Sequence, residues 1–392
     1  MRMPQGFSTV LLLSLCQSLA MSVTPMIMLI GSFIGADLAP SPALATLPLA
    51  MLVVGAALGT VPATLAMQRF GRRCVFICAL LLAAIVLILL VETLILRKFW
   101  LYVLCIGCVG FFLVAFQQVR FAAMEAVAPH YGVTAASVVL LSGVIAAFIG
   151  PEIAVYGQYL FSVEYQGAFY MAAALLIFVA VVLIFYRNQT HTKPTREAQP
   201  RALIDIIQQP VFWLALASSS IGFAIMVYIM TATPISMHLH NGHSLLDTKW
   251  VIQSHIAAMF LPSLFVPSLI ALCGLRLLML MGLLAYLACI VIALLDSQLI
   301  HFWWSLVCLG IGWNFLFVAG TSLLPQCYSA GEGYHAQAFN DGVLFATQAI
   351  AALSAGWVLN LWGWQSLLLS CIPIMLLLPV IMWRVRVKRA LS

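Results

Sequence analysis

At residues 68–73 the chain reads Gln68-Arg69-Phe70-Gly71-Arg72-Arg73, which places three arginines and a glycine within six residues. An apolar run, residues 43–66, precedes this stretch, and a second apolar run, residues 74–96, follows it. About 20 apolar residues, at roughly 1.5 Å per residue, span the hydrocarbon core of a bilayer. We therefore interpret residues 68–73 as a tight, charged turn at a membrane surface.

The composition extends this interpretation to the whole chain. Of the 392 residues, 64% are hydrophobic and 7% are charged, whereas a soluble domain carries about 25% charged residues. This excludes a soluble intracellular enzyme, a nucleic-acid-binding protein and a disordered protein. We predict an all-α membrane protein whose twelve helices follow twelve apolar runs: residues 8–34, 43–66, 74–96, 99–127, 133–157, 165–186, 210–235, 250–273, 276–295, 301–324, 336–359 and 364–383.

Lysine and arginine placement predicts the orientation of the helices. If the N-terminus is cytoplasmic, thirteen of these residues fall in inside segments and only Arg97, Lys98 and Lys249 fall in outside loops. Cytoplasmic loops of membrane proteins carry this excess of positive charge. We expect a multi-pass protein of the cytoplasmic (inner) membrane with both termini in the cytoplasm. The net charge of +6 then reflects orientation and requires no nucleic-acid partner.

Two internal matches at one offset predict a repeat. Gly274-Leu-Arg276 follows Gly71-Arg-Arg73 by 203 residues, and a run that begins at Cys308 follows a similar run at Cys105 by the same 203 residues. A long polar stretch lies between the copies. We predict a six-helix bundle at 1–186, a cytoplasmic linker at 187–209 and a second six-helix bundle at 210–392. The end of the linker is either a short surface helix or the start of the seventh membrane helix.

These features resemble those of the major facilitator superfamily. The turn at residues 68–73 is similar to the loop Gly-x-x-x-Asp-Arg-x-Gly-Arg-Arg between helices two and three of that family, with the Arg-x-Gly-Arg-Arg core intact. Thr64 and Gln68 stand where the family has its glycine and aspartate. Gly150-Pro151 in helix five resembles part of a motif of proton-linked drug antiporters. The helix-ten sequence Gly-Trp-Asn-Phe-Leu-Phe resembles importers of vitamins or siderophores.

The resemblance implies two six-helix bundles related by a pseudo-two-fold axis, which move a small organic solute by alternating access. In the family, the loop aspartate engages the start of helix eleven and an acidic residue of helix four. Because Gln68 lacks that charge, we expect Arg69 to pair with Glu125 and Arg72 or Arg73 to reach Asp341. The expected cytoplasmic gate is thus Gln68, Arg69, Gly71, Arg72, Arg73, Glu125 and Asp341, and Gly150 and Pro151 form a helix-five kink.

Ionisable and amide side chains inside membrane runs are the candidates for solute binding, because they are costly to insert. Arg120 lies near the inner end of helix four, where it either faces the cavity as a bidentate donor or extends to the interface. Asn314 in helix ten either lines the cavity or bonds between helices. The expected cavity residues are Arg120, Gln118, Gln117, Asn314, Gln17 and Gln348.

Two carboxylates are candidates for proton coupling. Glu152 follows the Gly150-Pro151 pair near the outer end of helix five, and it either carries a proton or is an ordinary interface residue. Asp341 lies at the predicted start of helix eleven, where a helix cap is the alternative to an ion-paired gate.

Three histidines, His238, His240 and His243, lie in the outer loop after helix seven. Imidazoles at this spacing bind transition metals in some proteins, but there are no cysteines and few acidic residues nearby, and we expect solvated loop residues. No nucleophile–base arrangement or phosphate-binding glycine loop is present. We expect no enzyme activity, no metal and no cofactor.

The sequence predicts a monomeric secondary transporter of a small organic solute, with H⁺ as a possible coupling ion and membrane lipid as its surroundings. Two alternatives stay open. One is an importer of a siderophore or a vitamin-like compound, and the other is a sensor or scaffold that keeps the fold without transport.

Overall fold

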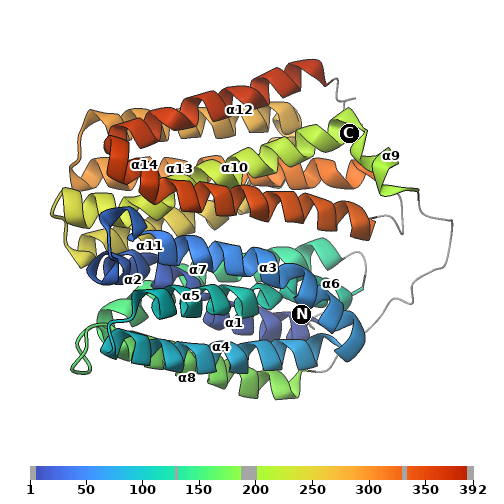
Figure 1. Ribbon diagram of the computed structural model, residues 1–392. Helices are drawn as coiled ribbons and strands as arrows, with labels where there is room; N and C mark the ends of the chain where they lie inside the picture. Colours follow the sequence, from blue (N-terminus) through green and yellow to red (C-terminus); the bar gives the residue numbers. More distant parts are fainter. Residues whose placement is uncertain (1–5, 129–130, 187–200, 329–332, 386–392) are drawn as a thin grey trace. The chain divides into compact units, whose positions relative to one another are not determined.

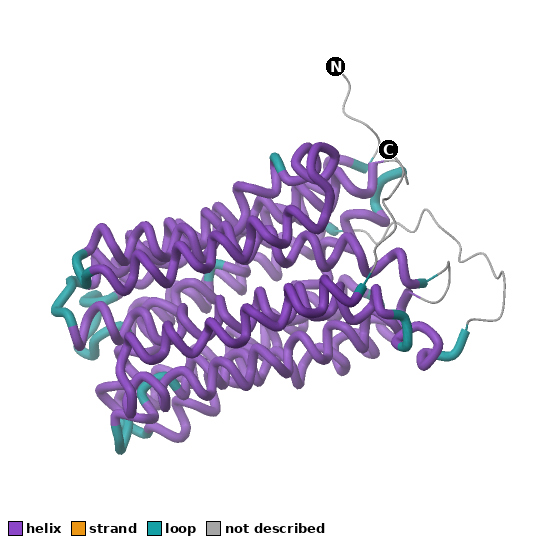
Figure 2. Tube along the Cα trace, turned by 90° about the horizontal axis from the view of Figure 1, so that it is seen from above, coloured by secondary structure: helices purple, strands orange, loops and turns teal. Residues whose placement is uncertain are grey.

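The computed structural model describes residues 6–128, 131–186, 201–328 and 333–385, and over these ranges the chain consists of helices joined by short turns (Figures 1 and 2). The all-α prediction is confirmed. The helices are α1 Phe7–Met21, α2 Val23–Leu38, α3 Leu47–Phe70, α4 Arg72–Ile95, α5 Phe99–Leu113, α6 Val119–Glu125, α7 Gly132–Gly157, α8 Gln166–Val182, α9 Leu203–Ile207, α10 Pro210–Ile235, α11 Leu245–Phe260, α12 Val266–Leu295, α13 Leu299–Leu323 and α14 Gly333–Arg384.

Within the described ranges, nine helical spans are long and apolar enough to cross a membrane. Two of the longest helices each contain one glycine with non-helical angles, Gly274 in α12 and Gly363 in α14. The predicted boundaries between helices eight and nine and between helices eleven and twelve fall at these glycines. The criterion of length and apolarity counts α14 once and does not count α7 or α11, so the total of twelve crossings stays a prediction.

The structure repeats itself at the predicted offset of 203 residues. Gly71 has φ 80° and ψ 156°, and Gly274 has φ 75° and ψ 167°, a conformation that favours glycine. The guanidinium of Arg73 donates to the carbonyl of Ile184, and that of Arg276 donates to the carbonyl of Val385. Each arginine thus ties the turn that it follows to the last turn of the sixth helix of its half.

The chain forms two compact units, which we describe separately. Unit 1 comprises residues 1–194 and 244–256, and unit 2 comprises residues 195–243 and 257–392. In unit 1, α4 packs against α5 and α8, and α1 packs against α7. In unit 2, α12 packs against α13 and α14, and α10 packs against α14. Residues 187–200 of the predicted linker lie outside the described residues, and the predicted domain boundaries stay a prediction.

Part of the predicted linker is a helix of its own. The helix α9 is five residues long and ends before α10 begins, so this segment is a short helix separate from α10, and its position on the membrane surface stays a prediction. Gln209 Nε2, between α9 and α10, donates to the carbonyl of Cys327 at 2.8 Å. The start of the seventh long helix is thereby fixed to the end of α13 within unit 2.

Glycines bring the helices of unit 1 unusually close. A Cβ atom on Gly110 of α5 would overlap the carbonyl oxygen of Leu52 on α3, and one on Gly55 of α3 would overlap the carbonyl oxygen of Gly107. Small residues at membrane helix contacts allow such backbone approach. Gly150 has the same role in α7, where a Cβ would overlap the carbonyl of Ser22, and α7 stays helical through Pro151. The kink predicted there stays a prediction.

Replacing Gly110 with alanine tests this close approach. We expect Gly110→Ala to destabilise the protein by about 1–3 kcal/mol, because α3 and α5 must move apart to admit the methyl group. Gly342→Ala is the matched control, since nothing lies within 4 Å of the Cβ that it adds in α14. Unfolding in detergent, followed by circular dichroism, measures both. Equal stability of the two variants would contradict the packing described here.

Candidate functional site

The arginine-rich turn is held by contacts from Arg72. Its Nη2 atom donates to Glu125 Oε1 at 2.5 Å, and its Nη1 atom donates to the carbonyl of Gln118 at 3.1 Å. Glu125 is the last residue of α6, and Gln118 ends the 3₁₀ segment that precedes α6. One guanidinium therefore joins the start of α4 to both ends of α6.

The predicted pair between Arg69 and Glu125 is wrong, because Arg72 occupies the acid. Arg69 lies in the last turn of α3, is exposed, and has its guanidinium carbon 5.4 Å from the ring centroid of Phe70. Gly71 turns the chain between the two arginines, so that Arg72, and not Arg69, begins the helix that packs on α5. Gln68 is exposed beside Arg69.

A buried tyrosine lies next to the Arg72–Glu125 pair. Burial raises the pKa of Tyr186 above its ordinary value, and the Glu125 charge raises that pKa further, while the Arg72 charge lowers it. The phenol therefore stays protonated at neutral pH.

Three of the predicted cavity residues lie at a break in the fourth membrane helix. The α-helix α5 ends at Leu113, a 3₁₀ segment covers Val114–Gln118, and α6 resumes at Val119. Gln117 and Gln118 end the 3₁₀ segment, and Arg120 lies half-buried in the first turn of α6. A 3₁₀ stretch within a helix often marks a functional hinge, and it leaves carbonyl groups available to other donors. Arg72 uses the Gln118 carbonyl in this way.

Gln17 is the predicted polar residue of the first membrane helix. It lies half-buried in α1, and its Oε1 atom is buried without a hydrogen-bond donor. Gln348, the corresponding candidate in α14, is buried at 6% exposure. Both amides thus lie within the protein, and their contact with solute stays a prediction.

Asn314 is bonded between helices of unit 2. Its side chain is 1% exposed, and Nδ2 donates to the carbonyl of Met259 at 2.7 Å and to Ser263 Oγ at 2.6 Å. Met259 lies in the last turn of α11, where a 3₁₀ segment that contains Pro262 follows. Of the two alternatives for Asn314, the structure gives the interhelical bond, and its contact with solute stays a prediction.

An aromatic cluster surrounds the residue before Asn314. We define the unit-2 aromatic cluster as Phe223 of α10, Phe260 of α11, and Trp313 and Phe317 of α13. Trp313 and Phe317 are stacked, with centroids 5.0 Å apart and planes at 12°. Phe223 meets both rings edge-on, at 5.0 and 5.1 Å, and Phe260 approaches Trp313 at 5.9 Å.

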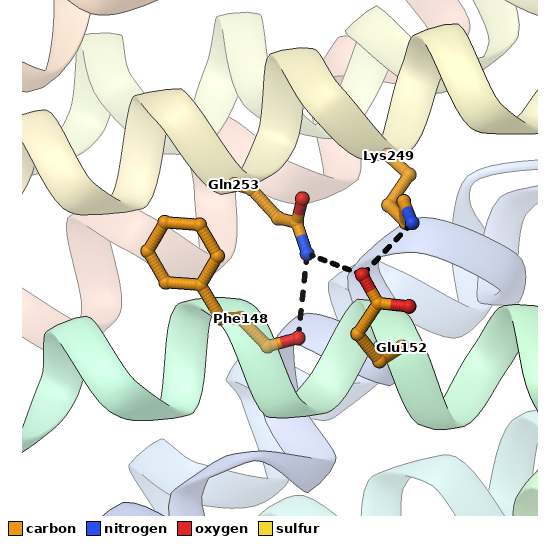
Figure 3. A network of polar contacts seen from close by, with 4 residues as sticks. All are labelled: Phe148, Glu152, Lys249 and Gln253. Carbon is orange, nitrogen blue, oxygen red and sulfur yellow. Dashed lines mark hydrogen bonds and ion pairs between the residues drawn. The ribbon is translucent and has the colours of Figure 1, made fainter.

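Glu152 belongs to a polar network within unit 1 (Figure 3). Lys249 Nζ, on α11, lies 2.8 Å from Glu152 Oε1, and Gln253 Nε2, one turn further along α11, donates to the same oxygen at 3.5 Å and to the carbonyl of Phe148 at 3.3 Å. The Lys249 side chain is 12% exposed and that of Glu152 is 40% exposed. The pair therefore binds α11 to α7 at a partly desolvated position.

The capping alternative for Asp341 is wrong. The helix α14 begins at Gly333, so Asp341 lies in its third turn, beyond the backbone N–H groups that a cap would receive. Asn340 Nδ2 donates to Asp341 Oδ1 at 3.1 Å. Asp341 and the arginines of residues 69–73 belong to different units, and their pairing stays a prediction.

The prediction that all three histidines lie in a loop is wrong for His238 and His240, because a π-helical segment, Ser236–His240, continues α10. His238 and His243 bond to backbone carbonyls. His238 Nδ1 lies 2.7 Å from the carbonyl of His243, and His243 Nε2 lies 2.8 Å from the carbonyl of Ser297. A carbonyl only accepts, so each of these ring nitrogens carries a proton. Among the described residues, no three His, Cys, Asp or Glu side chains lie together as metal ligands. His238 and His243 close the turn between α10 and α11.

Sequence comparison places the chain in a family. The profile of the Major Facilitator Superfamily matches residues 10–252. The chain belongs to the Major Facilitator Superfamily. It is 33% identical to the riboflavin transporter RfnT of Brucella anthropi, over 95% of both chains. It is 27% identical to the uncharacterised MFS-type transporter YddS of Bacillus subtilis, over 91% of this chain and 86% of the relative.

Solved structures agree on the fold of this superfamily member. A point mutant of the nucleoside transporter NupG aligns with a TM-score of 0.77 at 12% identity, over 96% of this chain and all of NupG. A bacterial homologue of the lysosomal transporter Spinster, inward-facing and occupied, aligns over both full chains with a TM-score of 0.65 at 14% identity. These likenesses show the fold alone. The family match and the apolar helices make the chain a multi-pass membrane protein and a secondary transporter.

Sequence reasoning missed several residues of this superfamily protein that the structure brings together. Lys249 served only as an outside positive charge, and Gln253 received no role, although their spacing of four residues places both on one face of a helix. Trp313 and Phe317 are also four residues apart, within the same motif that drew attention to Asn314. The spacing was visible, but the partner helices of each residue were not.

A double-mutant cycle tests the contacts of Arg72. We expect Arg72→Gln and Glu125→Gln to destabilise the protein, and the two together to cost less than their sum by about 1 kcal/mol. Arg72→Gln costs more than Glu125→Gln, because it also removes the donor to the Gln118 carbonyl. Arg69→Gln, the control in the same turn, changes stability by less than about 0.5 kcal/mol. Urea unfolding in detergent measures all four variants.

Two results would refute this assignment. The first is an Arg69→Gln variant that loses as much stability as Arg72→Gln. The second is strict additivity of Arg72→Gln and Glu125→Gln, since it would show that the two side chains do not interact in the folded protein.

Proposed function

We propose that this protein imports a riboflavin-like solute across the bacterial cytoplasmic membrane by alternating access. The observation that carries the proposal is the 33% identity with a riboflavin transporter, which extends over 95% of both chains. The fold likeness to other transporters supports the mechanism but does not name the solute.

The chemistry of the candidate residues fits such a solute. Riboflavin joins a planar three-ring heterocycle to a polyol chain and has no net charge at neutral pH. A site for it needs aromatic surface and neutral hydrogen-bonding groups more than a charged clamp. The predicted cavity residues include the amides of Gln17, Gln117, Gln118 and Gln348. In this proposal Arg120 donates to hydroxyl or carbonyl oxygens of the solute.

The Arg72–Glu125 pair serves as a cytoplasmic latch. It fixes the turn after α3 to α6, next to the 3₁₀ break that carries Gln117 and Gln118. If α6 moves at that break, either the distance between Arg72 and Glu125 increases or Arg72 moves with α6. The contact therefore couples the conformation of the Arg120 region to the turn at residues 68–73.

The Glu152–Lys249–Gln253 network serves as the external latch. It ties α7 to the first half of α11 through one ion pair and two hydrogen bonds from the side-chain amide of Gln253. Protonation of Glu152 would remove the charge that holds Lys249 and so release α11. In this proposal a proton therefore affects the transport cycle through Glu152. An uncharged solute gains nothing from the membrane potential, so accumulation requires a coupled ion such as H⁺.

The positive-inside bias supports an orientation with both termini in the cytoplasm. Residues 68–73 and the α9 region then face the cytoplasm, and Lys249 faces outward. We propose that the protein works as a monomer in lipid. Export, a siderophore substrate and a non-transporting sensor are the alternatives that the uptake assay distinguishes.

An uptake assay in a riboflavin-auxotrophic strain without its own importer tests the proposed function. We expect expression of this chain to restore growth on micromolar riboflavin and to raise the initial rate of labelled riboflavin uptake at least tenfold over the empty vector. Collapse of accumulation by a protonophore would support H⁺ coupling. Unchanged growth and uptake, with the protein present in the membrane, would overturn the proposal, and faster loss of preloaded riboflavin would indicate export.

A charge swap tests the external latch in the same strain. We expect Glu152→Gln and Lys249→Gln each to lower the uptake rate about tenfold, and Glu152→Lys with Lys249→Glu to recover a large part of it. Asp37→Asn is the matched control, because Asp37 and Arg97 form a pair whose side chains are both 63% exposed, and such pairs contribute little.

The pH dependence of Glu152→Gln separates a latch from a proton carrier. If uptake by this variant falls with rising pH as in the unmodified protein, Glu152 is not the coupling group. Uptake at the unmodified rate would remove the residue from both roles.

A further inference from the structure

Trp313 of the unit-2 aromatic cluster, and two further residues of α10 and α13, contain buried polar atoms that lack partners. Trp313 is 5% exposed, and its Nε1 donor is buried without an acceptor. Asn314 Oδ1 is buried without a donor, although Nδ2 of the same amide makes two bonds. Ser220 Oγ is buried without a partner, one turn of α10 before Phe223. Each such group costs about 1–3 kcal/mol unless something satisfies it.

A structural role accounts for some of the polar atoms of Trp313 and Asn314 but not for all of them. Asn314 Nδ2 stabilises the end of α11, so an asparagine at this position has a structural role. That role uses the two N–H donors and leaves Oδ1 unsatisfied. A phenylalanine at position 313 would keep the ring contacts with Phe223, Phe260 and Phe317 without burying an N–H group. The indole nitrogen therefore adds a cost that the aromatic packing does not require.

Two of the three helices contribute residues from near their middle, whereas Phe260 is the last residue of α11. Asn314 is fifteen residues from the start of α13 at Leu299, and Phe223 is thirteen residues from the start of α10 at Pro210. At roughly 1.5 Å per residue both positions lie about 20 Å along their helices, close to the centre of a 30 Å hydrocarbon layer. Solute sites of secondary transporters lie near this depth.

The three phenylalanines are less buried than Trp313. Phe223, Phe260 and Phe317 are half-buried, so part of each side chain is accessible, whereas Trp313 is 5% exposed. Stacking on such ring faces binds planar heterocycles, and offset or edge-on geometry at 4.5–7 Å is favourable. The cluster thus combines accessible aromatic side chains with the N–H donor of Trp313, and Asn314 and Ser220 add one carbonyl acceptor and one hydroxyl.

We propose that the unit-2 aromatic cluster binds the planar ring of the solute, and that Trp313 Nε1 and Asn314 Oδ1 bond to its polar edge. A ring that carries a carbonyl next to an N–H supplies the acceptor that Trp313 lacks and the donor that Asn314 lacks. The pyrimidinedione end of a flavin has this pattern. The inference rests on the proposed function, and it assigns the ring-binding side chains to α10, α11 and α13.

Binding to the purified full-length protein in detergent tests this assignment, with quenching of flavin fluorescence as the readout. We expect Trp313→Phe to raise the riboflavin Kd about five- to tenfold, because one buried hydrogen bond is lost while the aromatic packing is kept. Phe317→Leu removes a stacking ring and raises Kd by a similar factor. Trp383→Phe is the control: Trp383 is 85% exposed on α14, and its replacement leaves Kd unchanged.

A second ligand tests the polar edge without any mutation. Riboflavin methylated at N3 lacks the N–H that Asn314 Oδ1 accepts, and we expect the unmodified protein to bind it at least tenfold more weakly than riboflavin. Thermal unfolding of each variant shows whether it is folded. If Trp313→Phe does not fold, Phe317→Leu and the methylated ligand decide.

The outcomes separate the two proposals. Failure of the unmodified protein to bind riboflavin overturns both the solute and its site. Binding of riboflavin by the unmodified protein, with the same Kd in Trp313→Phe and Phe317→Leu, keeps the proposed function and overturns the ring-binding site. Equal affinity for riboflavin and its N3-methyl derivative overturns the polar-edge contact.

Discussion

In a membrane, every backbone carbonyl that a helix break exposes must find a donor inside the protein. The described structure meets this requirement with long polar side chains. Arg72 donates to the Gln118 carbonyl at the 3₁₀ break, Asn314 donates to the Met259 carbonyl before Pro262, and Arg73 donates to the last turn of the sixth helix. The breaks and their donors are also where the candidate functional residues gather. A straight helix would need none of these side chains, and it would have no point at which to bend.

This constraint explains which parts of the molecule the sequence predicts. Apolar length defines the membrane helices, and a helix end needs a turn-forming glycine, so Gly71 and Gly274 marked real boundaries. The repeat at 203 residues extends to the equivalent donors Arg73 and Arg276. These features depend on residues close together in the chain, and their periodicity or spacing is visible without a structure.

Contacts between distant segments were harder to predict. The partner of Glu125 depends on the rotation of α4 after Gly71, and a difference of three residues moved the expected pair from Arg69 to Arg72. Asp341 was expected at a helix start, but α14 begins at Gly333, ahead of the first apolar residues of the run. Lys249 and Glu152 are 97 residues apart, and nothing in either segment names the other. Whether Arg120 and Asn314 line one cavity stays a prediction, because the two residues belong to different units.

The two glycine turns differ in the charge of one residue, and this difference makes the two copies of the repeat unequal. Arg73 and Arg276 have the same role, but Leu275 occupies the position that corresponds to Arg72. One arginine of each turn therefore belongs to the shared scaffold, and the other is a specialisation of the first half. The ion pair between Arg72 and Glu125 therefore cannot form at the equivalent point of the second copy, where leucine carries no charge. The two copies thus differ in their electrostatics even where the backbone of the two turns is nearly the same.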